Sequence, residues 1–186
     1  MNKESNIILI TGGARSGKSS FAETSAKEKS KKDVVYIATS LVTDKEMEDR
    51  IKKHRNNRPN DWITIENYNN IDTIIDNYHN KSVFLIDCIT LMVSNLIYDF
   101  TNKFNNIDNF DKINDKILEY VNKIIIKCKN TNSTFLFVTN EVGMGIVPDN
   151  YISRVYRDIA GRTNQLLASN SKEVYLCVSG IPIKIK

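Results

Sequence analysis

The sequence has few of the residues that stabilise small secreted or fibrous proteins. Its 186 residues include only 3 cysteines, 3 prolines and 7 glycines. Such low glycine and proline contents exclude a collagen-like chain, and hydrophobic and charged fractions of 41% and 26% exclude wholesale disorder. Three cysteines cannot all pair, and each lies in an apolar stretch. Cys88, Cys128 and Cys177 are therefore predicted to be buried, reduced thiols.

Long apolar segments are also missing from the sequence. No run approaches the roughly 18 residues that a membrane-spanning helix needs. The run 7–10 is too short for the core of a signal peptide and leads directly into a glycine-rich loop. A net charge of +4 is mild and favours neither nucleic acid nor small anionic substrates. We expect one cytoplasmic domain over residues 1–186, without a membrane span and without a linker.

Short β-branched runs alternate with longer segments along the chain. These runs are 7–11, 34–39, 83–87, 134–139 and 174–178. Their near-continuous apolar character is typical of parallel strands that are covered on both faces. The segments 110–129 and 151–168 have a helical period, whereas 99–109 is rich in Asn and Asp and is predicted to be a surface loop. This alternation predicts an α/β domain of three layers, with helices on both faces of a mainly parallel sheet.

The predicted helix 151–168 divides into two sides. Its inward residues are predicted to be Ile152, Val155, Ile159 and Leu166, and its outer side carries Arg154, Asp158 and Arg162, spaced so that they can pair. Gly161 lies inside this helix, where glycine costs about 1 kcal/mol relative to alanine. We therefore expect either close packing or a ligand at Gly161.

The strongest pattern is the loop that follows the first predicted strand. It fits G-x-x-x-x-G-K-[ST] in full and lies between a predicted strand and a predicted helix. Glycines allow successive N–H groups to point at phosphate oxygens, and the following helix adds a favourable dipole. In such a loop the lysine reaches the β- and γ-phosphates, and the hydroxyl after it ligates Mg²⁺. The residues of this phosphate loop are Gly12, Gly13, Ala14, Arg15, Ser16, Gly17, Lys18 and Ser19.

A carboxylate follows another buried strand of the predicted sheet. Asp87 ends the apolar run 83–86, at the carboxyl edge where open α/β sheets bind their ligands. Many strands end in Asp at a turn, so the pattern becomes specific only beside a phosphate loop. Together with that loop, it predicts that Ser19 and Asp87 are the Mg²⁺-side groups. The residues 139–141, Thr-Asn-Glu, end a further strand at the same edge.

A basic segment contains one of the two histidines. Thr43 and Glu46 have the spacing of a capping box and predict a helix that ends near Arg55. His54 would lie in its last turn among several Lys and Arg residues. The segment is either a solvated basic helix end, stabilised by the helix dipole, or an anion site in which neutral His54 is the nucleophile or acid/base. The other histidine, His79, lies in a polar segment and is predicted to be on the surface.

Longer blocks over nearly the whole chain carry a further resemblance. They are 12–19, 36–40, 46–59, 64–66, 87–95, 139–148 and 157–165. Together they resemble the bifunctional adenosylcobinamide kinase/adenosylcobinamide-phosphate guanylyltransferase family. A phosphate loop is common to many NTPases, but the blocks Asn-Glu-Val-Gly and Gly-Arg-x-Asn-Gln are far more specific. The resemblance implies a RecA-like P-loop NTPase fold and a homotrimer in which the basic helix reaches a neighbouring subunit.

The resemblance also implies two reactions on one domain. A nucleoside triphosphate, ATP or GTP, phosphorylates the hydroxyl on the aminopropanol arm of adenosylcobinamide. GTP then gives its GMP unit to a histidine and releases pyrophosphate, and the substrate phosphate attacks the adduct to form adenosyl-GDP-cobinamide. His54 lies at the family's guanylylated position, whereas Lys53 stands where some relatives have a second histidine. The implied catalytic residues are His54, Lys18 and Asp87.

By similarity, further residues are expected to contact the nucleotide. A carboxylate suits guanine, which offers two adjacent donors, and Glu66 is the candidate for this role. The segment 142–148 with three arginines of the following helix either binds the corrinoid phosphate or builds the subunit interface, and we favour the interface. Outside the phosphate loop, the expected nucleotide contacts are Ala38, Thr39, Ser40, Arg55, Asn56, Asn57, Arg58, Glu66 and Asp87.

Two other functions fit parts of the same pattern. A P-loop kinase for another small alcohol would use the phosphate loop, with His54 as a bystander. A nucleotide-dependent switch would bind GTP tightly without turnover of cobinamide. No nucleic-acid partner is expected for any of the three functions.

Overall fold

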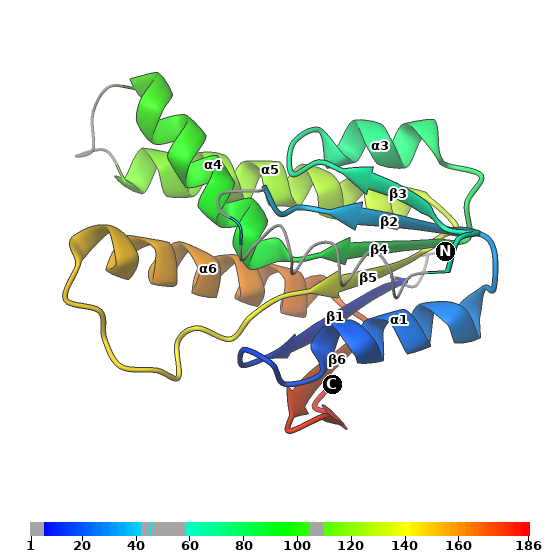
Figure 1. The fold of residues 1–186 in the computed structure, drawn as a ribbon. Coiled ribbons are helices and arrows are strands. Elements are labelled where there is room, and N and C mark those ends of the chain that lie inside the picture. The colour runs from blue at the N-terminus through cyan, green and yellow to red at the C-terminus, as the bar shows by residue number, and fades with distance from the viewer. Residues whose placement is uncertain (1–5, 42–44, 46–58, 105–109) are drawn as a thin grey trace.

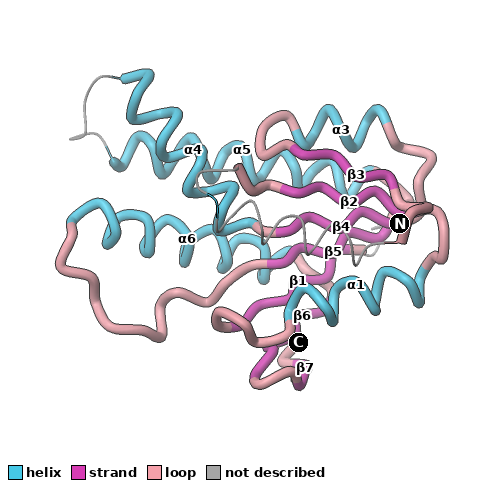
Figure 2. The backbone as a smooth tube through the Cα atoms, in the orientation of Figure 1, coloured by secondary structure: helices cyan, strands magenta, loops and turns pink. Residues whose placement is uncertain are grey.

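The computed structural model describes residues 6–41, 45, 59–104 and 110–186. In these ranges a seven-stranded sheet forms the centre, in the order β3-β2-β4-β5-β1-β6-β7, and helices cover both faces (Figures 1 and 2). The helix predicted to end near Arg55 lies outside the described residues, and so do His54, Arg55, Asn56, Asn57 and Arg58.

The strands are mainly parallel, as predicted. Of the described strands, β7 alone runs antiparallel to its neighbour, β6. The elements are β1 (Ile7–Gly12), α1 (Lys18–Lys29), β2 (Val34–Ala38), β3 (Ile63–Glu66), α3 (Ile71–Asn77), β4 (Val83–Asp87), α4 (Ile89–Phe104), α5 (Phe110–Asn130), β5 (Thr134–Val138), α6 (Tyr151–Asn170), β6 (Glu173–Val178) and β7 (Ile181–Lys184).

The core has two parts, one on each face of the sheet. On β1, Ile7 and Leu9 belong to a cluster with the helices α3 to α6, whereas Ile8 and Ile10 belong to a cluster with α1. Figure 1 shows α1 on the opposite face from α4, α5 and α6. Strands covered in this way lose water from both faces, which explains their continuous apolar runs. The predicted helix over 110–129 is confirmed. The apolar residues that recur on it every three or four positions are all buried, namely Phe110, Ile113, Ile117, Val121, Ile124 and Cys128.

The prediction of a surface loop over 99–109 is wrong for its first half. Residues 99–104 continue α4, because this part of the helix still packs Phe100 against the core. The carboxylate of Asp99 accepts a hydrogen bond from the Tyr68 hydroxyl at 2.8 Å. Residues 105–109 lie outside the described ranges.

The predicted inward side of α6 is wrong at its first turn. Ile152 is 46% exposed, whereas Ile159 is buried and Val155 and Leu166 pack partly against the core. The first turn of α6 extends beyond the ends of the strands (Figure 1), so Ile152 has no sheet to cover. In the described part of the chain, no helix combines the length and the apolar character needed to span a membrane.

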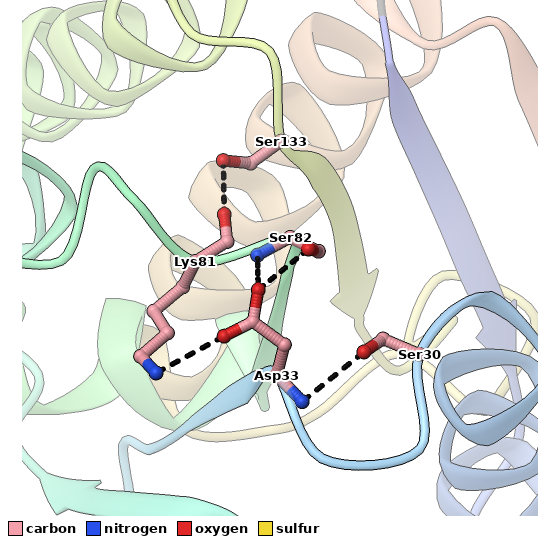
Figure 3. A network of polar contacts seen from close by, with 5 residues as sticks. All are labelled: Ser30, Asp33, Lys81, Ser82 and Ser133. Carbon is pink, nitrogen blue, oxygen red and sulfur yellow. Dashed lines mark hydrogen bonds and ion pairs between the residues drawn. The ribbon is translucent and has the colours of Figure 1, made fainter.

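A polar network at the amino ends of the strands holds the sheet in register (Figure 3). The Asp33 carboxylate accepts hydrogen bonds from the backbone N–H and the hydroxyl of Ser82, at 2.8 and 2.5 Å, and pairs with Lys81 at 3.0 Å. Ser30 accepts from the Asp33 N–H, and the Ser133 hydroxyl donates to the Lys81 carbonyl. The network therefore joins the end of α1 to the starts of β2, β4 and β5.

Candidate active site

The phosphate loop is packed so closely that two of its positions exclude any side chain. A Cβ at Gly12 would lie 2.4 Å from the Cys177 carbonyl oxygen, and one at Gly17 would lie 2.9 Å from the Cα of Gly180. Both residues also have positive φ angles, +149° and +89°, which L side chains rarely adopt. The Gly180 N–H donates to the Ser16 carbonyl at 3.0 Å, so the turn between β6 and β7 supports the loop from behind.

Lys18 begins α1 and holds its ammonium group within the phosphate loop. The side chain is buried, and Nζ donates to the Gly13 carbonyl at 2.5 Å and to the Ser16 hydroxyl at 3.4 Å. Residues 13–15 are exposed, so their backbone faces solvent at the carboxyl end of β1. Gly17 precedes α1 and has no side chain to cap the first N–H groups, which leaves them available to an anion.

The predicted carboxylates and their neighbours lie along one edge of the sheet. In the strand register, Ala38 of β2 pairs with Glu66 of β3 on one side and with Asp87 of β4 on the other. Asp87 is in turn level with Val138 of β5, which is level with Ile10 of β1, just before the phosphate loop. Neighbouring strands are about 4.8 Å apart, so Glu66 lies about 10 Å from Asp87 along this edge.

The segment Ala38–Ser40 is fixed to the end of β4. The Thr39 N–H donates to the Asp87 carbonyl at 3.0 Å, and the Thr39 hydroxyl donates to the Cys88 carbonyl at 2.6 Å. Ala38 and Thr39 are buried, whereas Ser40 is half-buried and more accessible. The Thr39 hydroxyl therefore supports the scaffold, a contact that the sequence pattern did not reveal.

Three polar contacts of the site, each at least partly buried, were also missed by the sequence patterns. The hydroxyl of Tyr36 donates to Oδ2 of Asp87 at 2.8 Å. On the other side of the edge, Asn164 of α6 accepts from the Thr139 hydroxyl at 2.7 Å and donates to the Asn140 carbonyl at 3.0 Å. The bond to Asp87 could have been suspected from the sequence, because Tyr36 is a phenol in the otherwise aliphatic strand 34–38 and a buried hydroxyl needs a hydrogen-bond partner.

A pocket of about 680 Å³ lies between α6, the strands β1 and β6, and Ile185, the residue that follows β7. It begins beside the phosphate loop, at Thr11 and Glu141, and the Glu141 N–H donates to the Gly12 carbonyl at 3.0 Å. Two cationic and two anionic side chains line it, since Arg157 and Arg162 are accompanied by Asp158 and Glu141. The formal charges of the lining residues therefore cancel, so the pocket has no net charge that would favour an anionic or a cationic ligand.

The three arginines of α6 have different surroundings. Arg154 donates to the carbonyls of Pro148 and Asp149, at 3.0 and 2.6 Å, and is not among the residues that line the pocket. Arg157 lines the pocket and donates to the Gly143 carbonyl at 2.7 Å. Arg154 and Arg157 thus tie the segment 143–149 to the helix.

Gly161 also lines the pocket, and the space around it is open. A Cβ at this position would meet no atom of the described structure within 4 Å. Close packing among the described residues therefore does not require glycine here, and a ligand at this position stays a prediction.

Among the described residues, the three cysteines and His79 are the other candidate nucleophiles. None of them is both reactive and close to the carboxyl edge of the sheet. All three cysteines are free and buried, as predicted. Burial raises the pKa of the Cys88 thiol, with a further contribution from the Asp87 charge, and burial raises the pKa of Cys128 well above its usual range. His79 is exposed, with Nδ1 2.8 Å from the Asp76 carbonyl oxygen, which confirms its surface position.

A mainly parallel sheet, a phosphate loop between β1 and α1, and a carboxylate at the end of β4 define a P-loop NTPase with a RecA-like sheet. A solved structure of an ATPase domain shares this fold, with a TM-score of 0.52 and 13% identity over 95% of this chain and 70% of that chain. Residues 8–185 match the model of the CobU family, described as cobinamide kinase / cobinamide phosphate guanyltransferase. The chain belongs to this family, as its resemblance implied.

Curated relatives match the chain over nearly their whole length. It is 43% identical to the bifunctional adenosylcobalamin biosynthesis protein CobU of Escherichia coli K12, over 97% of this chain and 99% of that protein. The protein of the same name from Salmonella typhimurium LT2 is also 43% identical, with the same coverage. The bifunctional adenosylcobalamin biosynthesis protein CobP of Pseudomonas aeruginosa is 35% identical, over 96% of each chain.

Proposed function

We propose that this chain phosphorylates adenosylcobinamide with a nucleoside triphosphate and then transfers GMP from GTP to the product, through a GMP-histidine intermediate. The observation that carries the proposal is the full-length match to a family described by both reactions, on a chain whose phosphate loop and Asp87 share one sheet edge. The names of the relatives, all called bifunctional, support two activities rather than one.

In this proposal the phosphate loop binds the triphosphate of either nucleotide. Its exposed backbone N–H groups and the Lys18 ammonium neutralise phosphate charge as it redistributes during transfer. Mg²⁺, when bound, would add the charge of a divalent ion on the same oxygens. Ser19 and Asp87 would hold it, and their oxygens fit a hard cation that takes one or two protein ligands and completes its shell with phosphates and water.

The guanylyl transfer is assigned to His54. Its imidazole nitrogen attacks the α-phosphorus of GTP, the bond to the pyrophosphate oxygen breaks, and pyrophosphate leaves. The phosphate oxygen of adenosylcobinamide phosphate then attacks the same phosphorus, and the bond to the imidazole breaks. Arg55, Asn56, Asn57 and Arg58 would contact the nucleotide nearby, and Ser40 and Glu66 would contact the nucleoside.

The same proposal includes a cytoplasmic homotrimer. The homotrimer is supported by large apolar side chains that are exposed before and at the start of α6, and on or next to the β6–β7 hairpin. They are Met144, Ile146, Val147, Tyr151, Ile152, Val178, Ile181, Ile183 and Ile185. Exposed apolar side chains grouped in this way are typical of protein contacts.

Incubation with α-labelled GTP and Mg²⁺ tests the covalent step. We expect the protein to retain a label that is stable in base and labile in acid. The variant His54→Ala should lose it, and the matched control His79→Ala should keep it, because the exposed His79 lies away from the phosphate loop. Label that persists in His54→Ala would contradict the assignment of the nucleophile.

The kinase step is tested with γ-labelled ATP or GTP and adenosylcobinamide. We expect label in the corrinoid product. Phosphate transfer without any GMP label on the protein would favour the single-activity kinase. Tight GTP binding with neither transfer would favour the nucleotide switch.

A further inference from the structure

Tyr36 is a buried phenol in a strand of aliphatic residues. It lies in the middle of β2, with 1% of its surface exposed, in the apolar cluster on the α1 face. Its hydroxyl reaches the neighbouring strand and donates to Oδ2 of Asp87 at 2.8 Å. Because the ring is fixed by core packing, the position of this donor is set by the scaffold and not by solvent.

The backbone around Asp87 is held separately. The Thr39 N–H donates to the Asp87 carbonyl, the Thr39 hydroxyl donates to the Cys88 carbonyl, and the Asn95 amide donates to the Thr39 carbonyl at 2.9 Å. With the backbone fixed, the freedom that remains to Asp87 is rotation of its side chain. The Tyr36 hydroxyl acts on that rotation, because it engages Oδ2 of the carboxylate. Within the described part of the chain no hydrogen bond to Oδ1 is found, so this oxygen can face a ligand.

We propose that Tyr36 is a positioning residue that orients the Asp87 carboxylate toward the metal–nucleotide complex. The inference rests on the proposed function, in which Asp87 lies on the Mg²⁺ side of the nucleotide. Hydrogen bonds that orient a ligating carboxylate commonly change metal affinity by about 10- to 100-fold when they are removed. Tyr36 would therefore control metal use without touching either substrate.

A second tyrosine of the same sheet provides a matched control. The Tyr175 hydroxyl donates to Oε2 of Glu173 at 2.6 Å, within β6 and away from the phosphate-loop edge. If tyrosine–carboxylate bonds only stabilise the fold, then removing either hydroxyl should lower stability and leave metal use unchanged. If Tyr36 positions Asp87, then only its removal should change metal use.

The test compares Tyr36→Phe and Tyr175→Phe with the unmodified chain. Binding of Mn²⁺ in the presence of GTP is measured by electron paramagnetic resonance, and the Mg²⁺ dependence of GMP labelling is measured in parallel. For Tyr36→Phe we expect the half-saturating metal concentration to rise about 10-fold. Nucleotide binding without metal should be unchanged, and saturating Mg²⁺ should restore most of the labelling rate. Tyr175→Phe should match the unmodified chain in both measurements.

The outcomes separate this inference from the proposed function. Unchanged metal dependence in Tyr36→Phe, together with weakened metal binding in Asp87→Asn, would overturn the positioning role and leave the metal-side role of Asp87 intact. Unchanged metal dependence in Asp87→Asn would instead overturn that part of the proposed function. In the double variant, the Tyr36→Phe change should add nothing to Asp87→Asn, and additive effects would contradict the inference.

Folding of each variant is checked by its thermal unfolding midpoint. Phenylalanine keeps the ring that packs in the core, so Tyr36→Phe removes one oxygen and little else. Tyr36→Met, with a flexible apolar side chain of adaptable shape, provides the same loss of the hydroxyl if the phenylalanine variant does not fold.

Discussion

Gly12 is the residue at which the shape of the phosphate loop is most constrained. Its φ angle is +149°, and the Cys177 carbonyl occupies the space that a side chain would need. Gly13, the next residue, has open space around it and is exposed. Two adjacent glycines of one motif are therefore under different steric constraints, and the sequence alone does not show which of them must be glycine.

Gly12→Ala should weaken nucleotide binding by about 10- to 100-fold, because backbone strain of about 1–3 kcal/mol must be relieved by moving the loop. Gly13→Ala is the matched control and should bind nucleotide nearly as the unmodified chain does. Titration calorimetry with a non-hydrolysable GTP analogue measures both. Equal affinity of the two variants would contradict this account of the loop.

Asp33 makes the stability of the fold depend on pH. Hydrogen bonds from Ser82, followed by the bond and charge of Lys81, hold the pKa of the Asp33 carboxyl below its ordinary value of 3.8. A depressed native pKa contributes stability that is fully present above 3.8 and is lost as the pH falls through the native pKa. The contribution is modest, since Asp33 is partly exposed and screened by solvent.

Asp33→Asn should therefore destabilise the protein at pH 7, and the difference from the unmodified chain should shrink as the pH falls below about 4. Urea unfolding at pH 7 and at pH 3 measures this difference. Asp61→Asn, at an exposed carboxyl in a turn, is the control and should show no such change with pH. A difference that stays constant across this range would contradict the role of the ionised Asp33 carboxylate.

At the scale of elements, the strands that could be predicted from the sequence are those buried on both faces, because such burial requires a continuous apolar run. The inner strands of the sheet are β1, β2, β4, β5 and β6, and each was predicted from its apolar run. The edge strands β3 and β7 are partly or wholly exposed, and β7 contains Pro182, which an edge strand tolerates. Neither has a buried run, so neither was predicted.

The contacts that build the site could not be predicted from spacing. Tyr36 and Asp87 are 51 positions apart, and Thr139 and Asn164 are 25 apart, so these hydrogen bonds depend on how the strands and α6 assemble. The phosphate loop and Asp87 could be predicted because each follows its own strand locally. The roles of His54 and Glu66 remain predictions that rest on the family resemblance.

Gly161→Ala tests the open space on α6. Alanine is favoured over glycine by about 1 kcal/mol in a helix, and no neighbour opposes the added methyl group. The unfolding midpoint should rise by about 2–4 °C. Gly145→Ala, a loop position with similarly open space, is the control and should not show the helical gain. A lower midpoint in Gly161→Ala would contradict this account, and a raised KM for adenosylcobinamide would show that the pocket receives the acceptor.

At the scale of the whole molecule, the two ends of the sheet have separate tasks. The amino ends are tied together by the Asp33 network, and the carboxyl ends carry the phosphate loop, Asp87 and Glu66. Fixing one edge keeps the other in register, because a slip of one residue would turn every side chain to the opposite face. One domain can thus present a single phosphate site to two successive reactions.

The turn at Gly180 has a consequence for the order in which this chain matures. The phosphate loop is translated early, yet its supports, the Cys177 carbonyl and the Gly180 N–H, are translated late, and β1 itself lies between β5 and β6. Such long-range contacts close slowly and only after the downstream strands exist. A nascent chain on the ribosome therefore contains the phosphate-loop sequence long before that loop can fold. We expect the chain to bind a triphosphate only after the β6–β7 hairpin has formed.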